Sequence, residues 1–279
     1  QLRQLKPKKI STTTALSPLA LLTLAAGGGG GGGAPAVSGT SAPSFSNAVS
    51  GNVVKGPLTG AVVFLDRNDN GTLDEGEESV STGPGGAYNL QIVGDIPDGA
   101  QVVVITSGAK DESTGETLEA DVVLKAPATS KVITPLTTMA SAAGLTSSQV
   151  AEALGLGEGV DIFEFNPFVE KDSADQARQD AAAKLEAVAV MVTKNIVEVA
   201  KAAGGGSVSS SNLTEAVNAS AKAFKTSVDS GSSVTLDTLA GNDFLNNMIS
   251  EVKASTNSSN WDINDVDTTE IANTLTSAK

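Results

Sequence analysis

Hydrophobic residues in the first half of the chain occur in short runs that are rich in β-branched side chains. Such side chains pack well on the pleated surface of a sheet. Turn signals with Gly and Pro, such as residues 83–86 and 97–99, separate the runs. Six or seven short strands punctuated in this way predict a Greek-key-like β-sandwich over residues 51–133. The runs are residues 52–55, 61–65, 87–93, 101–106, 118–124 and 131–133.

From about residue 134 the hydrophobic period changes to one of three to four residues. The clearest example is residues 172–203, in which one apolar stripe is formed by Leu185, Val188, Val192, Ile196 and Val199. We predict a small α-helical bundle over residues 134–279, so the whole chain is expected to be an α+β multidomain protein. The other predicted helices are residues 135–143, 147–154, 211–228, 236–253 and 266–278.

Several helix ends can be read from their capping residues. Thr134 precedes a Pro at the first helical position, and Gly144 ends that helix. Thr146, followed three residues later by Gln149, forms a capping box. Asp267 is the predicted N-cap of the last helix.

Residues 1–50 differ from both regions and predict an extended apolar and glycine-rich N-terminal segment. A basic stretch precedes an apolar run at 15–26, which is too short to span a membrane but fits an export signal. The alternative is a retained element that joins subunits of an assembly. The seven glycines at 27–33 are typical of a flexible tether, or they allow close backbone packing between chains. Residues 34–50 continue as a linker.

Charge and composition narrow the function classes. The formal net charge is −14, although all the charged side chains among the first ten residues are basic. A surface this acidic repels nucleic acid, so we expect no nucleic-acid partner. The chain has no Cys and no His. It therefore lacks disulfides, zinc sites built on those residues and His-based catalytic triads. We expect a protein that is not an enzyme.

One motif carries specific chemistry. Residues 66–77 match the twelve-position calcium loop of EF-hands, with a glycine at the sixth position, where the backbone turns sharply. The seventh position contributes its backbone carbonyl, and the twelfth contributes a bidentate carboxylate. The predicted metal ligands are Asp66, Asn68, Asn70, Thr72, Asp74 and Glu77.

The expected ion is Ca²⁺, because the loop offers hard oxygen ligands in a flexible arrangement, whereas Mg²⁺ demands tight octahedral geometry. The alternative is a polar surface turn that binds nothing. The flanking segments read as strands rather than helices, so the loop is expected to join two strands. Binding would then stabilise the module rather than open a pair of helices, as calcium sensors do.

Residues 53–63, the loop and residues 82–90 resemble the carboxypeptidase-regulatory-like and serine-aspartate-repeat B-type β-sandwiches of bacterial surface proteins. The resemblance covers about residues 50–133 and implies an extracellular stalk, spacer or adhesin made rigid by Ca²⁺. Residues 132–138, 153–156 and 161–168 resemble a segment that often follows such modules in bacterial exoproteins.

Other polar clusters fit structural roles better than chemical ones. Asp161, Glu164 and Glu170 include carboxylate pairs of the kind that glycosidases use. We expect them to be solvated while nearby Phe side chains hold a loop on the bundle. Trp261 is expected to anchor the last helix. A second acidic group lacks the loop glycine, so we interpret it as helix-capping acids: Asp262, Asn264, Asp265 and Asp267.

Together these features predict an extracellular or cell-surface structural protein. We expect a subunit of a filament, stalk or fibre that associates with copies of itself through the N-terminal segment and attaches to a cell surface or envelope. The alternative is a tethered adhesin or ligand-binding module, which would be monomeric in solution. A hydrolase that works with carboxylates is the third, weakest reading.

Overall fold

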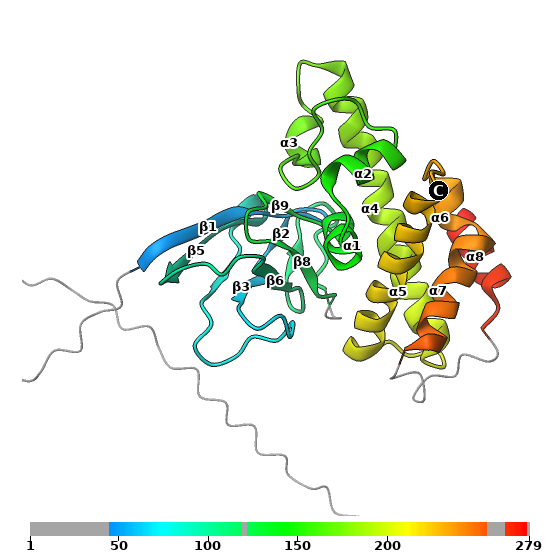
Figure 1. The fold of residues 1–279 in the computed structure, drawn as a ribbon, viewed down its shortest axis with the longest axis horizontal. Helices are drawn as coiled ribbons and strands as arrows, with labels where there is room; N and C mark the ends of the chain where they lie inside the picture. The colour runs from blue at the N-terminus through cyan, green and yellow to red at the C-terminus, as the bar shows by residue number, and fades with distance from the viewer. Residues whose placement is uncertain (1–44, 119–121, 256–265, 278–279) are drawn as a thin grey trace, which may run out of the picture. The chain divides into compact units, whose positions relative to one another are not determined.

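The computed structural model describes residues 45–118, 122–255 and 266–277 (Figure 1). Strands precede helices along the chain, which confirms the predicted α+β composition. The predictions for residues 1–44 and for Trp261 lie outside the described residues.

Nine strands are present in the described part of the chain, and they form three sheets. The largest sheet is antiparallel, with strand order β4-β3-β6-β8. In the order β5-β1-β9, β1 runs antiparallel to β5 and parallel to β9, while β2 and β7 form a short antiparallel pair. The strands are β1 (Phe45–Val53), β2 (Leu58–Thr59), β3 (Val62–Asp66), β4 (Ser79–Ser81), β5 (Ala87–Val93), β6 (Gln101–Ile105), β7 (Lys110–Asp111), β8 (Leu124–Pro127) and β9 (Val132–Ile133).

The pattern of buried and exposed side chains shows which faces of these strands lie against the core. In β5, Tyr88, Leu90 and Ile92 are buried, and the residues between them are exposed. This strand therefore covers the core with one face. In β3, Val63 through Asp66 are all buried, so side chains on both faces of that strand are shielded from water.

Two strand predictions differ from the structure. The first strand begins at Phe45, inside the segment that reads as a linker, because β5 supplies an antiparallel partner as far as Val93. Of the strand predicted at 118–124, the described residues Leu118, Val122 and Val123 are not in a strand, and β8 lies at Leu124–Pro127, where Val102 of β6 faces Ala126. The position of β8 depends on its pairing with β6, which local hydrophobicity does not reveal.

Eight α-helices follow β9 within the described residues. They are α1 (Pro135–Ala143), α2 (Ser147–Ala153), α3 (Pro167–Glu170), α4 (Gln176–Ala203), α5 (Ser210–Asp229), α6 (Leu236–Ala240), α7 (Asn242–Ala254) and α8 (Thr268–Thr276), and a short 3₁₀ turn, η1 (Pro84–Gly86), precedes β5.

The predicted caps are confirmed at three helices. Thr134 and Thr146 both form capping boxes, and the side chain of Asp267 accepts hydrogen bonds at the start of α8. The single helix predicted over 236–253 is wrong. It is two helices, because the backbone of Gly241 is extended, with ψ at 152°. The short α3, capped by Asn166, was not predicted.

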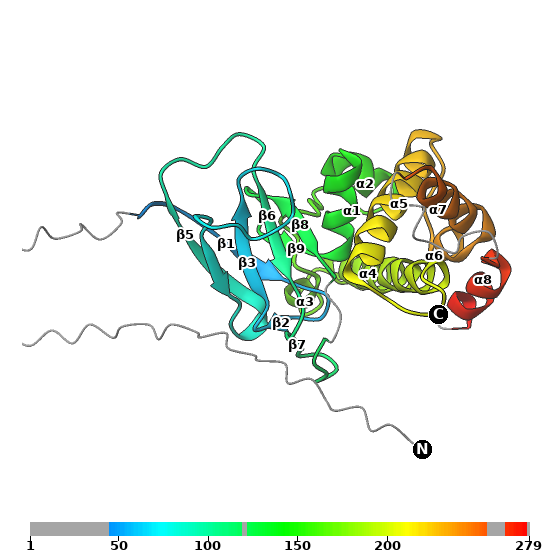
Figure 2. The same ribbon diagram turned by 90° about the horizontal axis from the view of Figure 1, so that it is seen from below.

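Helix α1 connects the strands to the helices (Figure 2). It contacts β8, β9, α4 and α5. The hydroxyl of Thr138 in α1 accepts a hydrogen bond from the N–H of Lys125 in β8. The N–H groups of Lys131 and Val132 both donate to the carbonyl of Phe163, at 2.7 and 3.0 Å. Buried side chains of the strands and helices form a continuous core.

None of the helices in the described ranges is both long enough and apolar enough to cross a membrane.

Candidate metal centre

The twelve-residue loop connects two antiparallel strands. Asp66 is the last residue of β3, and β4 begins at Ser79, which lies opposite Phe64. This confirms the prediction that strands rather than helices flank the loop. Gly71 has φ at +71°, a left-handed conformation that glycine adopts without a steric penalty, and Asp69 has φ at +56°. The backbone thus curls back on itself in the middle of the loop.

Asp66 holds the loop backbone from its first position. Its side chain is buried, with 2% of the residue exposed. One carboxylate oxygen accepts the N–H of Asn70 at 3.2 Å, and the other accepts the N–H of Gly71 at 2.7 Å. These two bonds place the carboxylate inside the curve of the loop.

Three further predicted ligands converge beside it. The side-chain amides of Asn68 and Asn70 donate to the same oxygen of Asp74, at 2.9 and 2.7 Å. Their amide oxygens accept backbone N–H groups of the loop, those of Asn70 and Thr72. An amide group presents a donor on one side and an acceptor on the other. A half-turn of either amide would therefore point an oxygen at the place where Asp74 now lies.

Glu77, at the last position, closes the loop. One oxygen of its carboxylate accepts the N–H of Arg67 at 2.8 Å, and the other accepts the N–H of Asp74 at 3.0 Å. Each carboxylate oxygen has two lone pairs, so each keeps an acceptor position after these bonds form. The structure thus brings Asp66, Asn68, Asn70, Asp74 and Glu77 into one hydrogen-bonded loop. Thr72 lies within the same curve.

The loop concentrates negative charge without a compensating cation. Within the described parts of the chain, no Lys or Arg forms an ion pair with Asp66, Asp74 or Glu77. The one basic residue inside the loop, Arg67, points away from it and pairs with Glu78 at 3.1 Å. Asp66, Asp74 and Glu77 carry like charges within twelve residues of chain, and a bound cation would reduce the repulsion between them.

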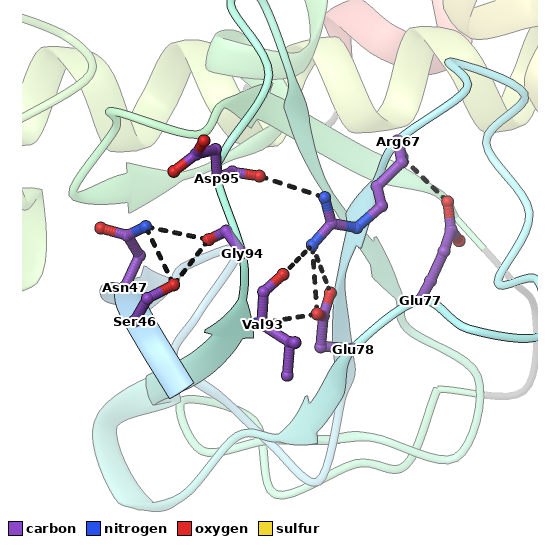
Figure 3. Close-up of polar contacts among 8 residues, drawn as sticks. All are labelled: Ser46, Asn47, Arg67, Glu77, Glu78, Val93, Gly94 and Asp95. Atoms are coloured by element: carbon purple, nitrogen blue, oxygen red, sulfur yellow. Dashed lines mark hydrogen bonds and ion pairs between the residues drawn. The ribbon is translucent and has the colours of Figure 1, made fainter. Parts of the chain in front are cut away.

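Arg67 joins the loop to strand β5 (Figure 3). Its guanidinium donates to the carbonyls of Val93 and Asp95, and Glu78 accepts the N–H of Val93 at 2.9 Å. Burial alone would raise the pKa of Glu78. The backbone N–H groups of Val93 and of Glu78 itself, together with the guanidinium of Arg67, outweigh that effect and hold the pKa of this carboxyl below its ordinary value.

The donor groups of this loop match the requirements of some metals and not of others. Among the described residues, no three carboxylate, imidazole or thiolate groups lie close enough to form a ready cluster. The set at this loop is mixed: it combines three carboxylates with two amide oxygens and a backbone carbonyl, which is the chemistry that Ca²⁺ takes and zinc does not. The residues fit Ca²⁺, provided that the two Asn amides rotate.

A groove of about 430 Å³ lies against the loop. It is lined by residues of the loop and of β6, β8, α1 and α5, which are distant in sequence. Hydroxyl and amide groups line much of it, together with Lys125 and three Val side chains. Sequence reasoning missed this groove entirely. The residues that line it include Asp66, Asp69, Asn70, Thr72, Lys125, Ser210, Ser211, Thr214 and Asn218.

The remaining polar clusters have structural partners. Glu170 forms an ion pair with Arg178, whose guanidinium also lies 5.1 Å from the centre of the Phe165 ring. Asp161 accepts the N–H of Phe163 at 2.9 Å. Asp267 caps α8 as predicted, while Asp262, Asn264 and Asp265 lie outside the described residues.

Comparison with known proteins gives no further guide to this loop: no family model matches the sequence, and neither a characterised protein nor a solved structure matches the chain.

Proposed function

We propose that this chain is an extracellular structural protein, a subunit of a surface filament, stalk or fibre that Ca²⁺ stabilises. In this proposal the strands form a Greek-key-like sandwich and the helices form a bundle. The observation that carries the proposal is the loop itself, in which five polar side chains converge on one curve of backbone and form no ion pair with a Lys or Arg of the described residues.

The ion would be held by the side chains of Asp66, Asn68, Asn70, Asp74 and Glu77 and by the carbonyl oxygen of Thr72. Bound there, Ca²⁺ supplies positive charge where the carboxylates repel one another. Its binding energy adds to the stability of the fold, because the unfolded chain has no preformed site. The bound ion would fix the connection between β3 and β4 and, through Arg67, the end of β5.

Location and assembly are part of the same proposal. The export-like N-terminus supports an extracellular or cell-surface location. Its apolar segment is the proposed contact between copies, and the same N-terminus is the proposed attachment to a cell surface or envelope. Because the chain carries a net negative charge, no nucleic-acid partner is proposed. No catalytic function is proposed.

The test combines stability with morphology. Thermal unfolding is followed in Ca²⁺, in Mg²⁺ and in chelator, and the same samples are imaged by electron microscopy, with a variant lacking residues 1–33 as the control for assembly. The proposal expects a higher melting temperature in Ca²⁺ than in Mg²⁺, and regular polymers that the deletion abolishes. Equal melting temperatures in Ca²⁺ and in chelator would refute the calcium site. Monomers under every condition would refute the filament.

A ligand-binding module is the second candidate, and the groove beside the loop favours it. Its volume falls in the range of small-molecule sites, and its lining of hydroxyl and amide groups with three Val side chains suits a polar ligand. Binding of neutral oligosaccharides, screened on an array with and without Ca²⁺, tests this candidate. Replacing Thr214 with a bulky Trp should block such binding without altering the loop.

A further inference from the structure

Strand β1 is covered along only part of its outer edge. In the sheet β5-β1-β9, β5 pairs with β1 from Phe45 to Asn52, but β9 pairs only with Asn52 and Val53. Among the described residues, 45–50 therefore have a neighbouring strand on one side only. Figure 1 shows this end of β1, with β5 beside it, reaching out from the rest of the strands.

The direction of the backbone groups can be followed along this edge. The N–H groups of Asn52 and Val54 donate to Lys131 and Ile133, which lie on the side away from β5. Backbone groups alternate in direction along a strand. The backbone N–H and C=O groups of Ala48 and Ser50 therefore point to the same open side. Within the described residues, no backbone group forms a hydrogen bond with them there.

The opposite edge of the same sheet is closed at both ends. In β5 the carbonyl of Ala87 accepts the N–H of Gly83 at 2.8 Å. At the other end, the backbone of Val93 is bound by the Arg67–Glu78 ion pair (Figure 3). Charged side chains on an edge strand prevent pairing with other chains. The outer edge of β5 has such protection, whereas no charged side chain from the part of the chain that the structure describes covers residues 45–50 of β1.

The charge pattern of the sequence shows the same contrast. The chain has a net charge of −14, yet residues 10–54 contain no Asp, Glu, Lys or Arg. Two copies of the chain repel each other over most of their surfaces, but not along this segment. At its end, Phe45 and Val93 face each other across the strands and are 55% and 41% exposed, so they form an apolar tip.

We propose that the open edge of β1, residues 45–50, pairs with the same edge of a second copy, antiparallel about a two-fold axis. Two identical edges are self-complementary in this orientation, because each offers the donors and acceptors that the other needs. The pairing would merge two three-stranded sheets into one continuous sheet. It requires neither Ca²⁺ nor residues 1–33, so it can hold or fail independently of the proposed function.

Disulfide trapping tests the pairing directly, because the full chain contains no Cys. Ala48→Cys places a thiol on the open edge near the proposed axis. Gln91→Cys, on the residue paired with Ala48 across β1 and β5, is the matched control on the protected side. Both positions are exposed. Under mild oxidation we expect covalent dimers of the Ala48→Cys chain, in Ca²⁺ and in chelator alike, and several-fold fewer dimers of the control.

A second pair of variants tests the same contact without crosslinking. Ala48→Lys adds a charge to the open edge and should shift the sedimentation profile from dimer toward monomer, whereas Gln91→Lys should not. Circular dichroism checks that both variants fold. The proposal is overturned if Ala48→Cys forms no more dimer than its control. It is equally overturned if the chain is monomeric and the amides of Ala48 and Ser50 resist hydrogen exchange, since the chain's own residues would then cover the edge.

Discussion

The backbone N–H of Arg67 donates to the carboxylate of Glu77 at 2.8 Å, which fastens the second position of the loop to its last. The side chain of the same arginine reaches Val93, at the end of β5. One residue thus connects the candidate metal centre to the edge of a neighbouring sheet. A substitution of Glu77 is therefore expected to weaken the contacts at the end of β5 as well as those in the loop.

Glu77→Gln should weaken Ca²⁺ binding about 10- to 100-fold, which corresponds to about 1.4–2.8 kcal/mol. The amide removes one negative charge and leaves a single oxygen where the bidentate carboxylate had two. Isothermal titration calorimetry measures the change. Glu75→Gln is the control, because Glu75 is an exposed acid of the same loop outside the ligand positions. Equal losses in both variants would mean that charge alone, and not coordination, governs binding.

Ca²⁺ at about 100 times its dissociation constant should raise the free energy of unfolding by about 2.7 kcal/mol. In a compact unit of this size that gain corresponds to roughly 5–11 °C in melting temperature. Differential scanning calorimetry across a Ca²⁺ titration gives the dependence. The shift should disappear in a chain that carries Asp66→Asn together with Glu77→Gln. A shift that survives these changes would place the ion elsewhere.

Gly71 and Gly86 have the same φ, +71°, but different surroundings. A Cβ at Gly71 would meet nothing within 4 Å, whereas at Gly86 it would lie 2.1 Å from the carbonyl oxygen of Val53. Gly71→Ala should cost about 1–2 kcal/mol, the price of a left-handed alanine. Gly86→Ala should cost clearly more, because β1 must also shift. Urea unfolding compares the two, and equal losses would contradict the clash.

Acidification should weaken the hydrogen bond between Glu78 and the backbone N–H of Val93 at the end of β5. The pKa of Glu78 is lower in the folded chain than its ordinary value of about 4.3. Its contribution to stability is therefore fully present above that value and is lost as the pH falls through the folded pKa. The protection of the Val93 amide against hydrogen exchange should fall over the same range. Glu78→Gln should show low protection without that pH dependence.

Thr82→Val should destabilise the junction between β2 and β3. The buried hydroxyl of Thr82 donates to the carbonyl of Leu58 at 2.5 Å and accepts the N–H of Ala61 at 3.0 Å. Valine keeps the shape but leaves both backbone groups without that partner, which costs about 1–3 kcal/mol for each such group. Thr59→Val, at a less buried position, is the comparison in chemical denaturation.

Local signals in the sequence predicted the parts of the fold that depend on a few neighbouring residues. The capping box at Thr146 and the strands around residues 66–77 are of this kind, because each needs only residues close in the chain. The loop ligands could be proposed for the same reason: they lie within twelve positions, and the turn at Gly71 brings them together.

The remainder depends on contacts between distant residues. Strand β8 lies later than its hydrophobic run suggests because Ala126 faces Val102. Phe45 joins a strand only because β5 is there to receive it. The groove brings Asn70 close to Ser210, although no pattern along the chain relates the two. Gly241 could have signalled the break between α6 and α7, since an isolated glycine weakens a predicted helix.

Strand β9 depends on a residue that follows it in the chain. The carbonyl of Phe163 receives the N–H groups of Lys131 and Val132, just before and at the start of this strand. A fragment ending at residue 133 would therefore expose two amides that the whole chain satisfies. Recombination between genes can move a module freely only when it brings all of its own partners. A transplanted segment that keeps these two hydrogen bonds must therefore extend past residue 133, at least as far as Phe163.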